Sequence, residues 1–492
     1  MSRLPEVLAA GVVAILASAC TLEPHYYRPE PPVPALGAAT QGAPAAAEIG
    51  WREFFPDPQL GQLIALALID NRDLRVAALN VESAQQRYRI QRADLFPTVS
   101  ASAVEEVERF PPGVLATSSP GSADSGASSP TGTGGSTLRF YDVGLGFTSY
   151  ELDFFGRIRS LDHAALQQYF GYIETRRSVQ LTLVAEVADA YLTVLTDETL
   201  LAITRDTLKN QNESFALTQR MFGAGTTTEL ALRQAESTVD TARANLAQYT
   251  RQLAQDRDAL QLLLGAPIPA GIDFSAGLDR RPAVAELEEG IASDVLVRRP
   301  DVLAAEHQLQ AANAQIGAAR AAFFPAITLT GSFGTASTQL SGLFKGDSRI
   351  WTFEPQISVP IFAGGANVAN LRATRLARDT AIAQYEKTIQ TAFQEVADAL
   401  AARRALDDQL AAQQALLMAA AKGYQLADMR YRAGVDSYLS ALDAQRTLYS
   451  AQQQLQSVRL LRLQNLVTLY KALGGGLLEH ARTVQATLQP PT

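Results

Sequence analysis

Side chains that could perform chemistry are few and scattered in this 492-residue chain. No HExxH motif occurs, and none of the four histidines has a second metal ligand at helical spacing. No Walker loop and no GxSxG nucleophile turn is present. We therefore expect no catalytic residue, no metal site, no cofactor and no enzyme activity. The histidines are His25, His163, His307 and His480.

Two short strings resemble parts of enzyme motifs without completing them. Gly223-Ala224-Gly225 is a GxG fragment that follows no predicted strand, so it is not a nucleotide-binding signal. The string DFFG from Asp153 to Gly156 lacks every other kinase element. We interpret these residues as turns between regular elements.

Cys20, the only cysteine, is the one residue with a predicted chemical role. It follows Arg3, an apolar run from Val7 to Leu16, and the small residues Ala17-Ser18-Ala19. This run is too short to span a bilayer, which takes about 20 residues in a helix. The junction resembles a bacterial lipobox, in which the thiol carries lipid. We predict a signal peptide at 1–19 and a lipid on Cys20; the alternative is ordinary cleavage with an incidental thiol.

An internal duplication organises the rest of the chain. MFGAGTTTELALRQAES from Met221 aligns with RYRAGVDSYLSALDAQR from Arg430 at an offset of 209 residues. NRDL ending at Leu74 aligns with RPDV ending at Val302 at an offset of 228. The 19-residue difference fits the Pro-, Gly- and Ser-rich loop 111–137 of the first copy.

Each copy places a turn between two long predicted helices. Gly225 and Gly434 can adopt the left-handed conformation that ends a helix. Thr226 in the first copy, and Asp436 or Ser437 in the second, are suited to an N-cap. An ordinary hairpin turn explains one copy, but two equivalent copies indicate a shared functional tip.

The predicted organisation is mainly α with short strands. An extended N-terminal segment at 20–60 precedes a first repeat at 61–280, a second repeat at 281–475 and a tail at 476–492. A heptad seam from Tyr385 to Tyr431 predicts coiled-coil packing, and the 66 residues from 366 to 431 would extend about 100 Å as a helix. The predicted helices are 61–94, 157–265, 291–322 and 366–473, and the predicted strands are 96–110, 138–154, 325–334 and 351–362.

The strands alternate apolar and polar residues, as membrane strands do. Trp351, Phe353 and Ile357 share one face, whereas Thr352 and Glu354 share the other. A soluble sandwich is the alternative, but the secretory signal, the lack of a predicted transmembrane helix and the helical flanks favour a membrane sheet. Such a sheet must close because lipid cannot satisfy a free edge, and four strands are too few. Several chains must therefore share one barrel.

Composition agrees with an extended helical envelope protein. The net charge is −8 without a polybasic segment, which argues against nucleic acid as a partner. Aromatic residues are only 7%, and the alanine-rich composition suits long packed helices better than one globular core.

The ordered set of motifs resembles the outer membrane efflux protein family, the TolC-like exit ducts, in its lipoprotein branch serving resistance-nodulation-division pumps. The resemblance covers essentially the whole chain. It implies a homotrimer in the outer membrane, in which each chain gives four strands to a shared twelve-stranded barrel and long helical hairpins to a periplasmic α-helical tunnel. The matching strings are LASAC, YYRPEPPVP, NRDLRVA, YELDFFGRIR, RRPDV, VPIFAGG and YRAGVDSYLSALDAQR.

The resemblance also implies a constriction at the second tip. Asp443 corresponds to a gate carboxylate and Leu439 to an apolar ring. The bracing positions correspond to Tyr431, Arg403 and Arg446. Three copies of Asp443 around one axis would favour cations and raise one another's pKa. The alternatives are a solvated carboxylate at Asp443 and a snorkelling seam residue at Arg403.

We expect a passive exit duct for drugs or other small molecules. Its expected partners are the inner-membrane pump, outer membrane lipid and a periplasmic adaptor (membrane fusion) protein, which would dock at the tips. The alternatives are a type I protein secretion duct and a coiled-coil envelope lipoprotein that does not conduct. In such systems the pump rather than the duct usually selects the substrates. The predicted docking residues are Gly225, Thr226, Gly434 and Val435.

Overall fold

The structure is a computed structural model that describes residues 21–33, 49–111, 136–275, 277–278 and 297–475. The predicted signal peptide, the predicted lipid site Cys20, most of the loop 111–137 and the tail 476–492 lie outside the described residues. The chain divides into two compact units. One comprises Met1–Tyr27, Ala84–Tyr169 and Gln308–Ala381, and the other comprises Arg28–Ser83, Phe170–His307 and Ile382–Thr492.

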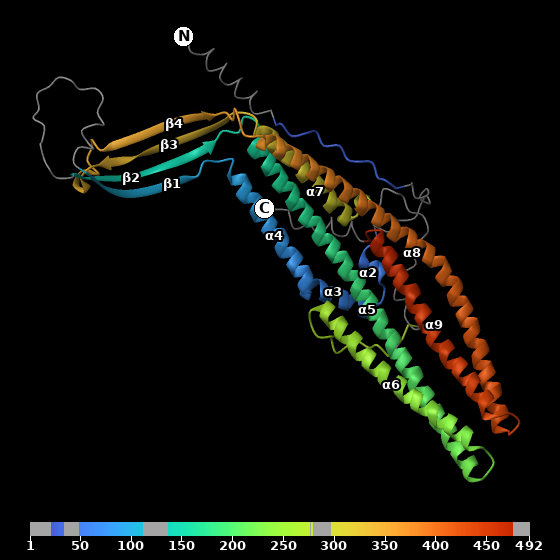
Figure 1. The fold of residues 1–492 in the computed structure, drawn as a ribbon. Helices are drawn as coiled ribbons and strands as arrows, with labels where there is room; N and C mark the ends of the chain where they lie inside the picture. The colour runs from blue at the N-terminus through green and yellow to red at the C-terminus, as the bar shows by residue number, and fades with distance from the viewer. Residues whose placement is uncertain (1–20, 34–48, 112–135, 276, 279–296, 476–492) are drawn as a thin grey trace, which may run out of the picture. The chain divides into compact units, whose positions relative to one another are not determined.

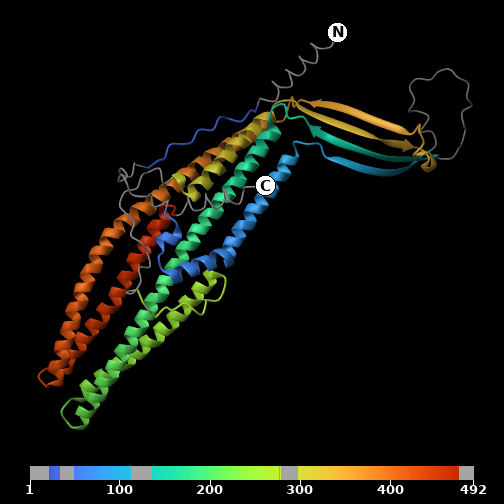
Figure 2. The same cartoon turned by 180° about the vertical axis from the view of Figure 1, so that it is seen from behind.

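The order of elements repeats along the chain (Figures 1 and 2). In each half a helix leads into two strands, and the strands lead into a hairpin of two long helices. The first half contains α2 (Trp51–Phe54), α3 (Pro58–Asp70), α4 (Arg72–Ala93), β1 (Val99–Phe110), β2 (Ser136–Glu151), α5 (Arg157–Gly223) and α6 (Glu229–Leu264). The second half contains α7 (Pro300–Ala321), β3 (Ala326–Ser337), the short 3-10 helix η4 (Leu340–Gly342), β4 (Arg349–Ser358), α8 (Ala366–Arg432) and α9 (Tyr438–Ala472).

The predicted helix 61–94 is wrong as a single element, because it is broken at Asn71. The Asn71 backbone is extended (φ −62°, ψ 133°), and its Oδ1 accepts a 2.9 Å hydrogen bond from the amide of Leu74. Asn71 therefore ends α3 and caps α4. In the second half the helix predicted from residue 291 begins at Pro300 within the described residues, since proline is favoured in a first helical turn.

The predicted heptad seam of α8 is confirmed. All seven buried residues of α8 fall on seam positions, because the spacing of four and three keeps one face of the helix against its neighbours. Leu406, Leu410, Leu417 and Tyr424, which are also on the seam, are half-buried. The buried residues are Tyr385, Ile389, Ala392, Val396, Ala399, Ala420 and Tyr431.

The duplication recurs as one capping contact. Asn71 Nδ2 donates a 2.8 Å hydrogen bond to the carbonyl of Leu263 at the end of α6. At the equivalent place Arg299 donates a 2.8 Å hydrogen bond to the carbonyl of Ala472 at the end of α9. Both side chains are buried. The Arg299 guanidinium also forms ion pairs with Asp301 (2.7 Å) and Glu395 (2.8 Å). The capping side chain is therefore neutral in the first repeat and part of a charged cluster in the second.

The segment predicted to be extended at 20–60 is partly helical, which corrects that expectation. Trp51, Phe54 and Phe55 are buried, and Phe54 stacks on Tyr470 of α9 with ring centroids 4.1 Å apart. Aromatic burial of this kind contributes a large share of local stability. The five-residue string WREFF therefore fixes this segment to the end of α9.

Residues 21–27, here called the N-terminal strap, lie along α7. Asn313 and Arg320 donate hydrogen bonds of 2.8 and 3.0 Å to two strap carbonyl oxygens. Between these contacts a β carbon on Gly317 would come within 2.9 Å of the strap backbone at Glu23. Only glycine leaves room for the strap at this position.

Two charged contacts add to the docking of the N-terminal residues. The Glu23 carboxylate lies 3.0 Å from Nδ1 of His163 on α5, and Nε2 of that ring lies 3.0 Å from the amide nitrogen of Gln167. One residue beyond the strap, Arg28 forms a bidentate pair with the buried Glu306 at 2.8 and 2.6 Å. These contacts make the docking specific in register.

The four strands form one antiparallel sheet in the order β1-β2-β3-β4 (Figure 1). The register confirms the predicted alternation. Val99, Phe147, Gly331 and Phe353 stand in one row, and the same face carries Ala101, Leu145, Phe333 and Trp351 in the next. The other face carries Ser100, Gly146, Ser332 and Thr352.

Strand ends differ from the predicted ones by up to four residues. The fourth strand ends at Ser358 rather than 362, because Pro360 has no amide to donate to a ladder. The second strand contains a bulge between Phe147 and Tyr150, where Ser149 has φ 54°. The expected turn into α5 is confirmed: Gly156 has φ 74°, and Asp153 accepts a 2.9 Å hydrogen bond from the amide of Arg159.

No transmembrane helix is expected from the sequence, but α5 contains an apolar stretch. Among the described residues it is the one helix long and apolar enough to cross a membrane by length and composition. Its most apolar 18-residue window has a mean hydropathy of 1.3, and 61% of that window is buried within the chain. This burial is typical of a packed helix, so the stretch is weak evidence for a membrane span.

Candidate functional site at the two helix turns

Each long hairpin reverses through a glycine with the same backbone geometry. Gly225 after α5 has φ 70°, and Gly434 after α8 has φ 72°. In both turns the glycine amide donates to the carbonyl three residues earlier, and the next amide donates to the carbonyl five residues earlier, all at 2.9 Å. This is the Schellman-type ending of a helix, which places glycine in the left-handed region. The predicted helix-ending role of both glycines is confirmed.

The helix start after the first turn differs from the prediction, whereas Ser437 was one of the two residues predicted to cap the second helix. Thr228, not Thr226, caps α6, and its Oγ1 accepts a 3.3 Å hydrogen bond from the amide of Ala231. The Thr226 hydroxyl instead donates a 3.0 Å hydrogen bond to the carbonyl of Met221. Ser437 occupies the N-cap position of α9 without a side-chain capping bond. In the first turn the chain needs further residues after Gly225 before α6 can start, so the N-cap lies at Thr228 rather than at Thr226.

The four predicted docking residues are all exposed at the turns. A β carbon on Gly225 or Gly434 would meet no atom within 4 Å. Glycine is therefore required by the backbone angle and not by crowding within the chain. Val435 beside the second glycine is 63% exposed, an apolar side chain at the end of a hairpin.

The second turn carries an ion pair that the first lacks. Arg430 and Asp436 face one another across the turn, with Nη2 3.0 Å from Oδ1. The hydrogen bond from Arg430 lowers the pKa of the Asp436 carboxyl below its ordinary value. The equivalent residues of the first turn are Met221 and Thr227. The two tips are thus alike in backbone and different in charge.

Tyr431 attaches the second hairpin to the first. Its hydroxyl lies 3.2 Å from Oγ1 of Thr218, whose own proton goes to the carbonyl of Ser214 at 3.0 Å. The tyrosine hydroxyl also lies 3.7 Å from Sδ of Met221, so its one proton is donated to Thr218 or to that sulfur. Around it an apolar cluster joins α5, α6, α8 and α9. The cluster is Ala235, Tyr431, Tyr438, Ala441 and Leu442, with Phe215, Leu217, Met221 and Ala231 packed against it.

Three of the predicted gate residues form an exposed row on α9. Leu439, Asp443 and Arg446 are spaced by four and three residues, which places them on one helix face. Leu439 is 57% exposed. Arg403 is not brought into this group, because it lies about 42 Å along α8 from Tyr431 and is half-buried on the seam. The helical rise alone separates it from the tip.

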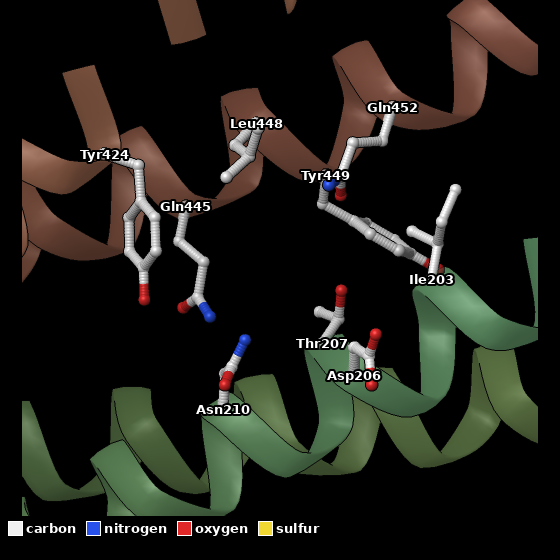
Figure 3. A pocket seen from close by; sticks show the side chains of 9 residues that line it. All are labelled: Ile203, Asp206, Thr207, Asn210, Tyr424, Gln445, Leu448, Tyr449 and Gln452. Carbon is white, nitrogen blue, oxygen red and sulfur yellow. The ribbon is translucent and has the colours of Figure 1, made fainter. Parts of the chain in front are cut away.

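Behind the second tip a small polar cavity of about 110 Å³ separates α5 from α8 and α9 (Figure 3). Gln445 and Tyr449 reach into it from α9, and Thr207 and Asn210 reach in from α5. Beside it the hydroxyl groups of Tyr449 and Thr204 lie 3.0 Å apart. The sequence did not single out Thr204, Thr218 or these lining residues. The role of a polar residue on a helix seam depends on the side chain it meets on the neighbouring helix, which the sequence does not identify.

Neither the tips nor the rest of the described chain forms a metal centre. No group of three or more His, Cys, Asp or Glu side chains is placed to hold an ion in the part of the chain that the structure describes. Two features recur in both halves, the glycine turn and the buried capping side chain. One apolar cluster contains residues from both halves.

Comparison with known proteins identifies the family. The model of the outer membrane efflux protein family matches residues 63–266 and 291–475. The toluene efflux pump outer membrane protein TtgC of Pseudomonas putida is 46% identical over 495 residues, covering 99% of both chains. The antibiotic efflux pump outer membrane protein ArpC of Pseudomonas putida gives the same identity and coverage.

The fold also matches a solved channel. The crystal structure of the open state of the MtrE outer membrane channel of Neisseria gonorrhoeae has a TM-score of 0.82 and 40% identity, covering 93% of this chain and 99% of that chain. The predicted TolC-like fold, mainly α with a membrane sheet, is confirmed by this similarity. With a family pattern over both halves and relatives at 46% identity along its length, this chain belongs to the outer membrane efflux protein family.

Proposed function

We propose that this protein is the outer-membrane exit duct of a tripartite efflux pump, and that it passes drugs or other small molecules passively out of the cell. The relatives are named for toluene and antibiotic efflux, which supports apolar and drug-like substrates. The family consists of efflux channel proteins, so transport rather than catalysis is the activity.

One observation carries this function: a sheet with one apolar face and two outer edges. Strands β1 and β4 lie at the ends of the sheet order, each with one neighbour in the described chain. In lipid an unpaired edge costs several kcal/mol for each unsatisfied backbone group. Three copies joined edge to edge satisfy every strand and enclose a pore with the polar face inward. Light scattering with detergent subtraction should give a trimer, and a folded monomer would contradict the proposal.

Conductance in a planar bilayer separates the duct from its alternatives. The assembled protein should give discrete single-channel steps, whereas a coiled-coil spacer gives none. Deleting the gene should lower drug resistance. Loss of a secreted protein with unchanged drug resistance would instead indicate a type I secretion duct.

The lipid anchor at Cys20 is part of the same proposal. The strap docks along α7 with its first residues beside Arg320, and β3 begins at Ala326 of the same unit. Docking at this point would hold an acylated residue 20 close to the sheet. Mass spectrometry of the mature N-terminus should find lipid on Cys20, and an unmodified residue would disprove the anchor.

The exposed row on α9 is the proposed gate. With three chains around one axis, three copies of Asp443 and Leu439 would narrow the tunnel mouth, with Arg446 and Tyr431 bracing the helices. Asp443→Ala should raise the resting conductance and let bulky antibiotics enter. The matched control Asp408→Ala removes an exposed carboxylate farther along α8 and should change neither. Resting conductance unchanged by Asp443→Ala would place the gate elsewhere.

The two glycine turns are the proposed docking sites for a periplasmic adaptor, which in turn engages an inner-membrane resistance-nodulation-division pump. Gly225, Thr226, Gly434 and Val435 stand exposed at the hairpin ends. Gly434→Trp should abolish adaptor crosslinking and efflux while leaving the closed trimer intact. Gly423→Trp controls for the added ring alone, because Gly423 is also exposed on α8 and a β carbon there meets nothing within 4 Å, but its φ is not positive. Equal crosslinking in both variants would refute the docking role.

A further inference from the structure

The apolar face of the sheet holds a track that the proposed pore leaves unexplained. On this face a groove of about 740 Å³ is floored by Ala101, Ala103 and Val143. Phe333 and Phe344 stand exposed beside the groove, at 63% and 77%. The small floor residues and the large rings together make an apolar depression.

A second depression continues the first along the same face. Its volume is about 450 Å³, and Leu145 and Phe333 line both. Its other walls include Phe147, Trp351 and Phe353. The Phe147 ring covers Gly331, where a β carbon would lie 2.9 Å from Cζ. The track is thus apolar along its length, and in the proposed barrel it faces lipid.

The track ends in arginine. Arg349 lines the first groove and stands in the row of Ala103, Val143 and Thr335. Because side chains alternate faces with a period of two, the rows fix which residues share its side.

Two more arginines follow on the same face, farther along the strands. Arg139 pairs with Val107 in register and Arg109 pairs with Thr137. The one strand carboxylate among them is Glu105, 4.0 Å from Arg139 and half exposed. All three arginines are exposed, so the end of the track is cationic.

The position of this charge matches the edge of a membrane. The rows nearer the helices are apolar, from Ile327 and Ile357 to Phe333 and Trp351. The apolar character of the face stops at the row of Arg349, which in the proposed barrel would lie where polar headgroups replace hydrocarbon. Arginine is suited to this level, since its stem lies on apolar surface while its guanidinium forms paired hydrogen bonds to phosphate.

We propose that this face binds a phosphate-bearing lipid of the outer leaflet, with an acyl chain along the track and its phosphate on Arg349, while Arg139 and Arg109 extend the cationic surface farther along the strands. The leaflet follows from the strand direction, because the arginines lie at the strand ends remote from α4 and α7. This site rests on the proposed membrane position of the sheet. The ligand is recognised by one acyl chain and one phosphate ester group, the chemistry that lipid A and a phosphoglyceride share.

Native mass spectrometry of the assembled full-length protein tests this site with lipid A, with lipid A lacking its phosphates, and with phosphatidylglycerol. Phosphorylated lipid A should remain bound, and removal of its phosphates should weaken binding at least tenfold. Arg349→Gln combined with Arg139→Gln should cause a similar loss, whereas Arg375→Gln, an exposed arginine on α8, should cause none. Ala103→Phe should fill the floor and displace lipid while all three arginines remain.

Each outcome decides the proposal. Equal retention of phosphorylated and dephosphorylated lipid A, or equal loss in the Arg375→Gln control, would overturn it. Stronger retention of phosphatidylglycerol than of lipid A would overturn the outer-leaflet assignment. Single-channel conductance of the same preparations, measured in a bilayer without lipid A, tests the duct function separately from the lipid site. A conducting trimer that binds no lipid A refutes the lipid site alone, and an assembly without conductance refutes the duct.

Discussion

The carboxylate of Glu23 lies 3.0 Å from Nδ1 of His163, and this hydrogen bond ties the strap to α5. The hydrogen bond raises the pKa of His163 above its ordinary value of 6.5, although burial opposes it. A raised folded pKa means that the stabilisation is complete below the ordinary value and is lost as pH rises through the folded value. Protonation also requires the Gln167 amide to turn, so that its oxygen faces Nε2.

The strap should therefore dock less stably on α5 as pH rises above the pKa of His163. Hydrogen exchange of residues 21–28, corrected for intrinsic rates, should show less protection at about pH 9 than at about pH 6. His163→Gln keeps a hydrogen-bonding side chain without the titration and should remove this pH dependence. Equal protection of the native strap at both pH values would contradict the expectation.

Arg299 should be worth more to stability than its counterpart in the first repeat. Arg299→Ala leaves Asp301 and Glu395 without their cation and the carbonyl of Ala472 without its donor. Losing a buried partner costs about 3–5 kcal/mol, and the low end applies because the side chains of Asp301 and Glu395 are 34% and 40% exposed. Asn71→Ala breaks neutral hydrogen bonds and should cost about 1–2 kcal/mol. Thermal unfolding followed by circular dichroism compares the two, and an equal loss would refute the ranking.

Asp197 should make the first hairpin less stable as pH rises. Burial, followed by a hydrogen bond and repulsion from Asp256, raises the pKa of Asp197 to about 8. The folded chain therefore holds a proton that the unfolded chain releases, so stability falls as pH rises from about 4 to about 8. Asp197→Asn should flatten this dependence and raise the unfolding temperature at neutral pH. Asp258→Asn, an exposed carboxylate on α6, is the control and should change little.

The Tyr431 and Thr218 hydroxyls should act as one unit in holding the tips together. Tyr431→Phe and Thr218→Val each remove the 3.2 Å hydrogen bond, worth about 1 kcal/mol. The double variant should lose little more than either single one, because the interaction is already gone. Resting conductance should rise to a similar level in all three. Fully additive effects would show that the two side chains act separately.

Patterns that depend on one element were predictable from the sequence. The seam of α8, the two faces of the strands and the left-handed glycines follow from periods of 3.5 and 2 and from steric limits on φ. Each of these is read from residues close together in the chain. Residues such as Tyr385 and Trp351 therefore lie on the faces that were expected.

Features that join distant segments were not predictable in this way. From the sequence, Trp51 and Phe54 were assigned to an extended tether. In the structure Phe54 packs on Tyr470, more than 400 residues later in the chain. Asn71, which separates α3 from α4, also donates to the carbonyl of Leu263 on α6. Arg403 was grouped with Tyr431 by resemblance, yet the rise of one helix separates them. Local periodicity carries no information on these partners.

The order of the sheet has a consequence for how the protein is made. A newly exported chain holds two long edges, the 12-residue β1 and the 10-residue β4, each able to pair with any exposed strand. In the proposed trimer the edge strands pair only with strands of other chains, so closing the barrel is an intermolecular step. The rate of trimer assembly should therefore rise steeply with chain concentration, and at low concentration monomers with unpaired, aggregation-prone edges should persist in the periplasm. We therefore expect the exported chain to need a chaperone that masks its strand edges until the proposed trimer forms.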